Sequence, residues 1–104
     1  MNYTITGQTS EALNELIRER LDAAIGQHES WVDSVHVRLS DVNGPRGGGL
    51  DKLCRVEVTL RGGMNVLIEH RGDDYYVIVN EAAERTKQAV GRKVARRRQA
   101  FRAG

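Results

Sequence analysis

Three segments in the middle of the chain alternate apolar and polar residues, and this alternation restricts the fold more than any other feature. The segments cover residues 31–40, 54–60 and 64–70. A period of two is typical of β-strands that have one buried face and one solvated face. Because each segment has only one apolar side, we expect a sheet that is covered on one face only. The inward sets are Val35, Val37 and Leu39; Cys54, Val56, Val58 and Leu60; and Met64, Val66 and Ile68.

Residues 10–26 have the pattern of a first helix that would cover this sheet. Ser10 is placed to cap the helix, and Gly26 fits its C-terminal stop. Apolar residues recur at helical spacing between them, and most outward positions are acidic. The apolar positions are Leu13, Ile17, Leu21 and Ala24, and the acidic ones are Glu11, Glu15, Glu19 and Asp22.

A second helix is predicted from about Asp74 to the C-terminal end of the chain, with Asp73 or Asp74 as its cap. The segment "YYVIV", residues 75–79, also has high β-propensity, so a fifth strand there is the alternative. We favour the helix because one apolar stripe runs through and beyond this segment. The stripe consists of Tyr76, Val79, Ala83, Thr86, Val90 and Val94.

A short β-rich segment, Asn2–Thr6, precedes the first helix and completes the predicted order β-α-β-β-β-α. The first β-α-β step predicts two parallel strands joined by a right-handed crossover, and the remaining strands form an antiparallel meander. The fold class is therefore α+β, with a four-stranded mixed sheet and two helices packed on one face. We expect one domain over residues 1–104, with a frayed tail from about residue 99.

Charge is distributed very unevenly along the chain. From Arg85 onward there are eight basic residues and no acidic one, whereas the first 84 residues carry eight basic and 14 acidic residues, a net charge of −6. This asymmetry predicts an anionic partner for the C-terminal end. The alternative is a basic helix end that only complements the helix dipole.

On a helix, Arg85, Arg92 and Arg96 would align at i, i+7 and i+11, away from the apolar stripe, with Lys93 beside them. Arginine donates to phosphate oxygens through a fork of N–H groups, so this surface suits the backbone of a nucleic acid. Tyr75 is the one plausible exposed aromatic residue. Recognition of backbone and shape is therefore expected rather than stacking on unpaired bases.

Residues 44–49 contain four glycines around Pro45 and Arg46. A nucleotide-binding loop would need Lys and then Ser or Thr after its last glycine, but Leu50 and Asp51 follow, and the loop joins two strands. Two interpretations remain. The segment is a long mobile hairpin connection, or it also presents Arg46 to a phosphate.

No catalytic residues, metal site or cofactor are predicted. His28, His36 and His70 lack partners at metal-ligand spacing, and we interpret His36 and His70 as surface histidines that share the open sheet face. Cys54 belongs to an inward set without a nearby base, and as the single cysteine it cannot form an intrachain disulfide.

The chain has no 18-residue apolar run and no signal peptide pattern, so we expect a cytoplasmic protein without a membrane partner.

The chain resembles the short ribosome hibernation-promoting factors, the protein Y or sigma-54 modulation family of ribosome-associated inhibitors. The motif "VRLSDVNGPRGG" leading into "DKLCRVEV", and "AAER" before the basic helix end, carry this resemblance. It implies a fold similar to a double-stranded-RNA-binding domain with an added first strand. It also implies a non-enzymatic stress-response role, in which the protein binds ribosomal RNA of the small subunit in the decoding region and silences idle ribosomes. No small-molecule substrate is implied.

Carried over by position, the resemblance implies RNA contacts from the last helix and the glycine-rich loop. The implied residues are Arg85, Lys87, Arg92, Lys93, Arg96, Arg97 and Arg46. The alternative is a protein-interaction or regulatory module that uses the open sheet face, with its basic tail incidental. That face would present His36, Arg38, Arg55, Glu57, Leu67 and Glu69.

Overall fold

The structure, a computed structural model, describes residues 1–41 and 51–103, with side chains as far as residue 100. The predicted order β-α-β-β-β-α is confirmed, with one short 3₁₀ helix added after the first α-helix. The elements are β1 (Tyr3–Gly7), α1 (Glu11–Ile25), η1 (Gly26–Trp31), β2 (Val32–Asp41), β3 (Lys52–Leu60), β4 (Asn65–Gly72) and α2 (Tyr75–Ala103).

The four strands form one mixed sheet in the order β1-β2-β3-β4. β1 pairs parallel with β2, while β2–β3 and β3–β4 are antiparallel, as the connections predicted. The register aligns the apolar sets, because Val37 lies opposite both Ile5 and Val56. Each strand therefore turns its apolar side chains to the same face of the sheet.

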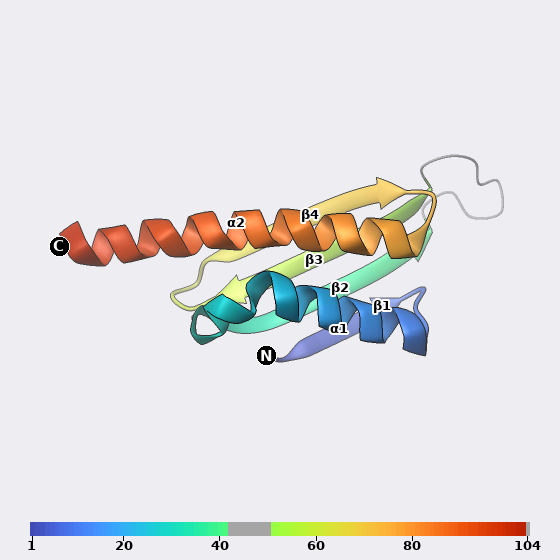
Figure 1. Cartoon of the computed structure of the whole chain (residues 1–104), viewed down its shortest axis with the longest axis horizontal. Coiled ribbons are helices and arrows are strands. Elements are labelled where there is room, and N and C mark those ends of the chain that lie inside the picture. Colours follow the sequence, from blue (N-terminus) through green and yellow to red (C-terminus); the bar gives the residue numbers. More distant parts are fainter. Residues whose placement is uncertain (42–50, 104) are drawn as a thin grey trace.

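Both helices cover that apolar face and run side by side in the same direction (Figure 1). α1 packs with Leu13, Ile17 and Leu21 buried, and Ser10 caps it by accepting a hydrogen bond from the Leu13 backbone N–H. α2 contributes buried residues as far as Val94, and its last turns extend past the end of the sheet (Figure 1). No helix of the described residues covers the far side of the sheet.

The alternative of a fifth strand over residues 75–79 is wrong. The Asp74 carboxylate accepts a hydrogen bond from the Tyr76 backbone N–H at 2.8 Å, so the helix begins here, with Asp74 as its cap. Helical geometry continues to Ala103, through the segment that we expected to fray. Fraying itself concerns motion and stays a prediction.

The expected apolar stripe on α2 is correct except at its first position. Tyr76 is 49% exposed, whereas Ile78 is only 1% exposed and takes the buried place. Tyr75 is half-buried, with Lys52 Nζ 5.5 Å from its ring centroid. The prediction that Tyr75 is the exposed aromatic residue is therefore wrong, because the cap at Asp74 turns Tyr75 toward the sheet and Tyr76 outward.

Candidate nucleic-acid interface

The basic residues predicted to contact RNA are distributed around α2 rather than gathered on one stripe. Arg92 and Arg96 are exposed, and Lys93 between them is half-buried. At 3.6 residues per turn, Arg85, Arg92 and Arg96 do share one side of the helix. Arg46 lies outside the described residues.

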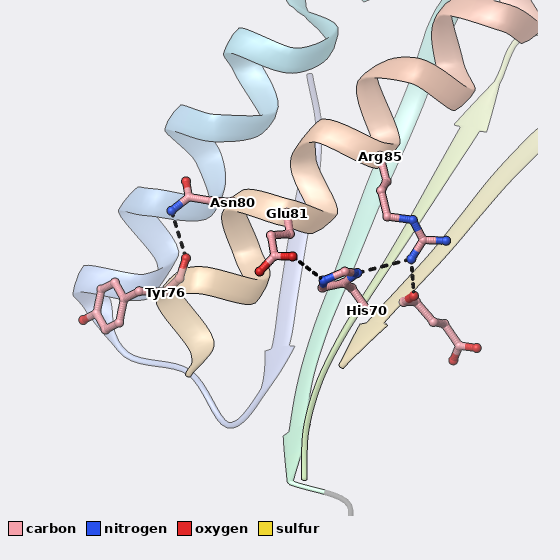
Figure 2. Close-up of polar contacts among 6 residues, drawn as sticks. His70, Tyr76, Asn80, Glu81 and Arg85 are labelled. Carbon is pink, nitrogen blue, oxygen red and sulfur yellow. Dashed lines mark hydrogen bonds and ion pairs between the residues drawn. The ribbon is translucent and has the colours of Figure 1, made fainter. Parts of the chain in front are cut away.

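Arg85 is held against the sheet edge. Its Nη1 donates to the backbone carbonyl of Glu69 at 2.7 Å and lies 3.3 Å from His70 Nδ1 (Figure 2). Since a guanidinium can only donate, His70 Nδ1 must accept, which leaves Nε2 to donate to the Glu81 carboxylate at 3.0 Å. Arg85 therefore ties α2 to β4, and the side of α2 that it shares with Arg92 and Arg96 is the β4 side.

Lys87 lies on the other side of α2. It lines a shallow hollow of about 200 Å³ between the two helices, together with Arg20 and Glu84. A residue two positions along a helix is rotated by about 200°, so Lys87 cannot share the surface of Arg85. A phosphate bound on the β4 side would therefore not meet Lys87.

Arg97 packs at the end of the sheet, against the turn between β3 and β4. A Cβ atom added to Gly62 would lie 2.6 Å from Arg97 Nη2, so the guanidinium occupies the space that this glycine leaves open. Gly62 has a φ of +83°, as the predicted tight turn requires. Arg97 therefore extends the basic surface toward this turn rather than along the β4 side.

The positive charge of Arg98 affects the pKa of His28, the histidine of η1. His28 is half-buried, and its Nδ1 has no hydrogen-bond partner in the described part of the chain. Burial lowers the pKa of His28, and the cation of Arg98 lowers it further. The last turns of α2 thus bring a positive charge close to the end of α1.

Acidification should destabilise the fold through His28. Because the folded-state pKa lies below the unfolded value, the unfolded chain takes up the proton first. The contribution of neutral His28 to the free energy of unfolding is fully present above about pH 6.5, and it is lost as the pH falls through the folded-state pKa. The measurement is the change in the urea unfolding midpoint between about pH 5.5 and about pH 7.5. This change should be smaller in His28→Gln and in Arg98→Gln than in the wild type. An unchanged difference in both variants would contradict this.

Cys54 is not placed as a nucleophile. Cys54 is 1% exposed, and burial raises its pKa to about 12, so it is not an activated nucleophile. Among residues 1–41 and 51–103, no group of three or more His, Cys, Asp or Glu side chains could hold a metal ion. Nor does this part of the chain contain a helix with the length and apolar character needed to cross a membrane.

The expectation that His36 and His70 share the open sheet face is wrong. His70 lies opposite Cys54 in the register and points to the helix-covered face, whereas His36 lies opposite Glu57 on the open face. The cluster of His70, Glu81 and Arg85 was therefore not predicted (Figure 2). The period of two already placed His70 with Ile68, and the spacing of Glu81 and Arg85 puts them on one helix side, so the signal was present.

Solved structures share this fold. The ribosomal subunit interface protein from Coxiella burnetii is 22% identical over 90% of this chain and 99% of that chain, with a TM-score of 0.69. The N-terminal domain of Protein Y from Thermus thermophilus is 21% identical over 88% of this chain and 98% of that chain, with a TM-score of 0.71. At these identities the likeness shows the fold.

A search of curated proteins found no significant match. The model of the family described as sigma 54 modulation protein / S30EA ribosomal protein matches residues 3–98, which is nearly the whole chain. The match includes all four strands, α1, and α2 as far as Arg98. This chain therefore belongs to the sigma 54 modulation protein / S30EA ribosomal protein family.

Proposed function

We propose that this protein binds the decoding region of the small ribosomal subunit, in the cytoplasm, and keeps idle ribosomes from translating. Membership of the family makes the chain a ribosome-associated protein and not an enzyme. The observation that carries the finer proposal is the β4 side of α2. It presents the exposed arginines Arg92 and Arg96, and no acidic residue follows Glu84 in the sequence.

Arg92 and Arg96 contact backbone phosphates of ribosomal RNA in this proposal, and Lys93 and Arg97 add charge beside them. Arg85 supports the same surface from α2, because its hydrogen bond to the Glu69 carbonyl holds the helix against β4. A guanidinium suits phosphate because several of its N–H donors can engage one anion.

The acidic first helix restricts the direction of approach. Glu11, Glu15 and Glu19 are exposed on α1, which lies beside α2 on the same face of the sheet (Figure 1). The exposed carboxylates of α1 outnumber its exposed arginines, and like charges repel, so a polyanion approaching the α1 side would meet net negative charge. RNA therefore reaches α2 from its β4 side, away from Lys87.

The test is co-sedimentation of the chain with purified small subunits, and separately with large subunits, over a series of salt concentrations. If three to five phosphates are neutralised, the log–log slope of affinity against salt should be about −2 to −4. We expect pelleting with small subunits only. A chain that never pellets with small subunits, or whose affinity is insensitive to salt, would refute the proposal.

A further inference from the structure

The open face of the sheet contains a hollow of about 310 Å³, on the side opposite to the helices. Four side chains line it: His36 and Arg38 from β2, and Arg55 and Glu57 from β3. The register places Arg38 directly opposite Arg55, and His36 directly opposite Glu57. The hollow is thus polar, and it is separate from the α2 surface.

The two arginines form an unfavourable pair of like charges. Directly opposite residues on antiparallel strands have Cβ atoms about 5 Å apart, and like charges at such positions are destabilising. Within the described part of the chain, no ion pair joins Arg38 or Arg55 to a carboxylate, although Glu57 and Glu69 lie on the same face. Two guanidinium groups therefore share one site without a local counter-charge bound to either.

The imidazole of His36 adds a further polar group at the edge of the hollow. Its Nε2 lies 3.3 Å from the Thr6 hydroxyl, and its other ring nitrogen has no partner among the described residues. Glu57 supplies an acceptor on the same wall. An anion that also carries hydroxyl or amino groups would find donors and an acceptor together here.

We propose that this hollow binds the phosphate group of a small phosphate monoester, such as a nucleotide or a sugar phosphate. Arg38 and Arg55 converge on the phosphate oxygens, and Glu57 accepts a hydrogen bond from the sugar. The volume lies at the lower end of small-molecule sites, which fits a ligand of this size. Among the described residues the exposed large hydrophobics are Leu67, Tyr76 and Val77, so this face has no aromatic platform for a single RNA strand.

The test follows backbone amide signals of the isolated chain by NMR during titration with inorganic phosphate and with AMP. We expect saturable shifts that cluster on β2 and β3 around the hollow. Arg38→Gln/Arg55→Gln should weaken binding of both ligands by about tenfold or more, because it removes both charged donors. The matched control is Arg71→Gln, because Arg71 is an exposed arginine of β4 outside the hollow. The affinity of this variant for both ligands should stay within about twofold of the wild type.

Glu57→Gln gives a result with the opposite sign. Removing a negative charge from the wall of the hollow should tighten binding of inorganic phosphate by about threefold. The affinity for AMP should rise less, because the variant lacks the Glu57 carboxylate that accepts a hydrogen bond from the sugar. A variant that weakened phosphate binding would contradict the assigned place of Glu57.

Shifts confined to α2, the absence of saturable shifts, or equal binding by the double variant would overturn the proposal. An oligoribonucleotide without terminal phosphates serves as the second arm. If it shifts the same residues more strongly than AMP does, the hollow reads an RNA phosphodiester and the small-ligand assignment is wrong. No ribosome is present in these titrations, so their failure is distinguishable from failure of the ribosomal proposal.

Discussion

Arg92→Glu/Arg96→Glu should lower the affinity for small ribosomal subunits by about a hundredfold at moderate salt. Each change removes a hydrogen-bonded contact to a charged group, which contributes about 1.5 kcal/mol or more, and adds a carboxylate facing the RNA. Both side chains are exposed, so the free energy of unfolding should change by less than about 0.5 kcal/mol per substitution. Sedimentation binding curves and urea unfolding measure the two quantities.

Arg61→Glu/Arg71→Glu is the matched control for this experiment. Both residues are exposed, one in the turn between β3 and β4 and one on the open side of β4, and the net charge changes by the same amount. If the proposed surface is correct, the control should lose affinity only slightly, through the general change in charge. Equal losses in the two variants would show that overall charge, rather than the β4 side of α2, determines binding.

Gly7→Ala should destabilise the fold by about 3 kcal/mol or more. Gly7 ends β1 with a φ of +90°, and a Cβ atom there would lie 2.0 Å from the carbonyl oxygen of Leu39. That oxygen also accepts the backbone N–H of Gln8 at 2.7 Å, so the end of β1 cannot move away without losing this bond. For a domain of this size, the expected fall in melting temperature is more than about 10 °C.

Gly26→Ala is the comparison for Gly7→Ala. Gly26 has a φ of −58° and a ψ of −35°, and nothing lies within 4 Å of an added Cβ atom. Alanine restricts the unfolded chain more than glycine does, so this change should be neutral or stabilise the fold by up to about 1 kcal/mol. If both variants unfold at the wild-type midpoint, the close approach of Gly7 to Leu39 has no energetic importance.

The fold was predictable because each of its elements has one strong periodic signal. Val35, Val37 and Leu39 alternate along β2, and Leu13, Ile17 and Leu21 recur along α1, so both apolar faces follow from the sequence. The start of α2 was harder to assign because residues 75–79 satisfy both periods. There a local contact, the hydrogen bond from the Tyr76 backbone N–H to Asp74, determined which tyrosine turns toward the sheet.

The site was less predictable because it depends on contacts between elements. Helical spacing correctly put Arg85, Arg92 and Arg96 on one side, but it could not show that Arg85 donates to a carbonyl of β4. It also could not show that Arg97 packs beside Gly62. Rotation about the helix axis follows from the sequence, whereas the neighbours on each side follow from tertiary packing.

The parallel course of the two helices affects how much of the basic charge is available to a partner. The peptide dipoles of α1 end in a partial negative charge of about half an elementary charge, and the last turn of α1 contains no basic residue. Arg98 of α2 brings a positive charge near that end, close enough to lower the pKa of His28 just beyond it. Part of the C-terminal charge thus neutralises the protein itself, so fewer counterions should leave RNA on binding than the eight basic residues suggest.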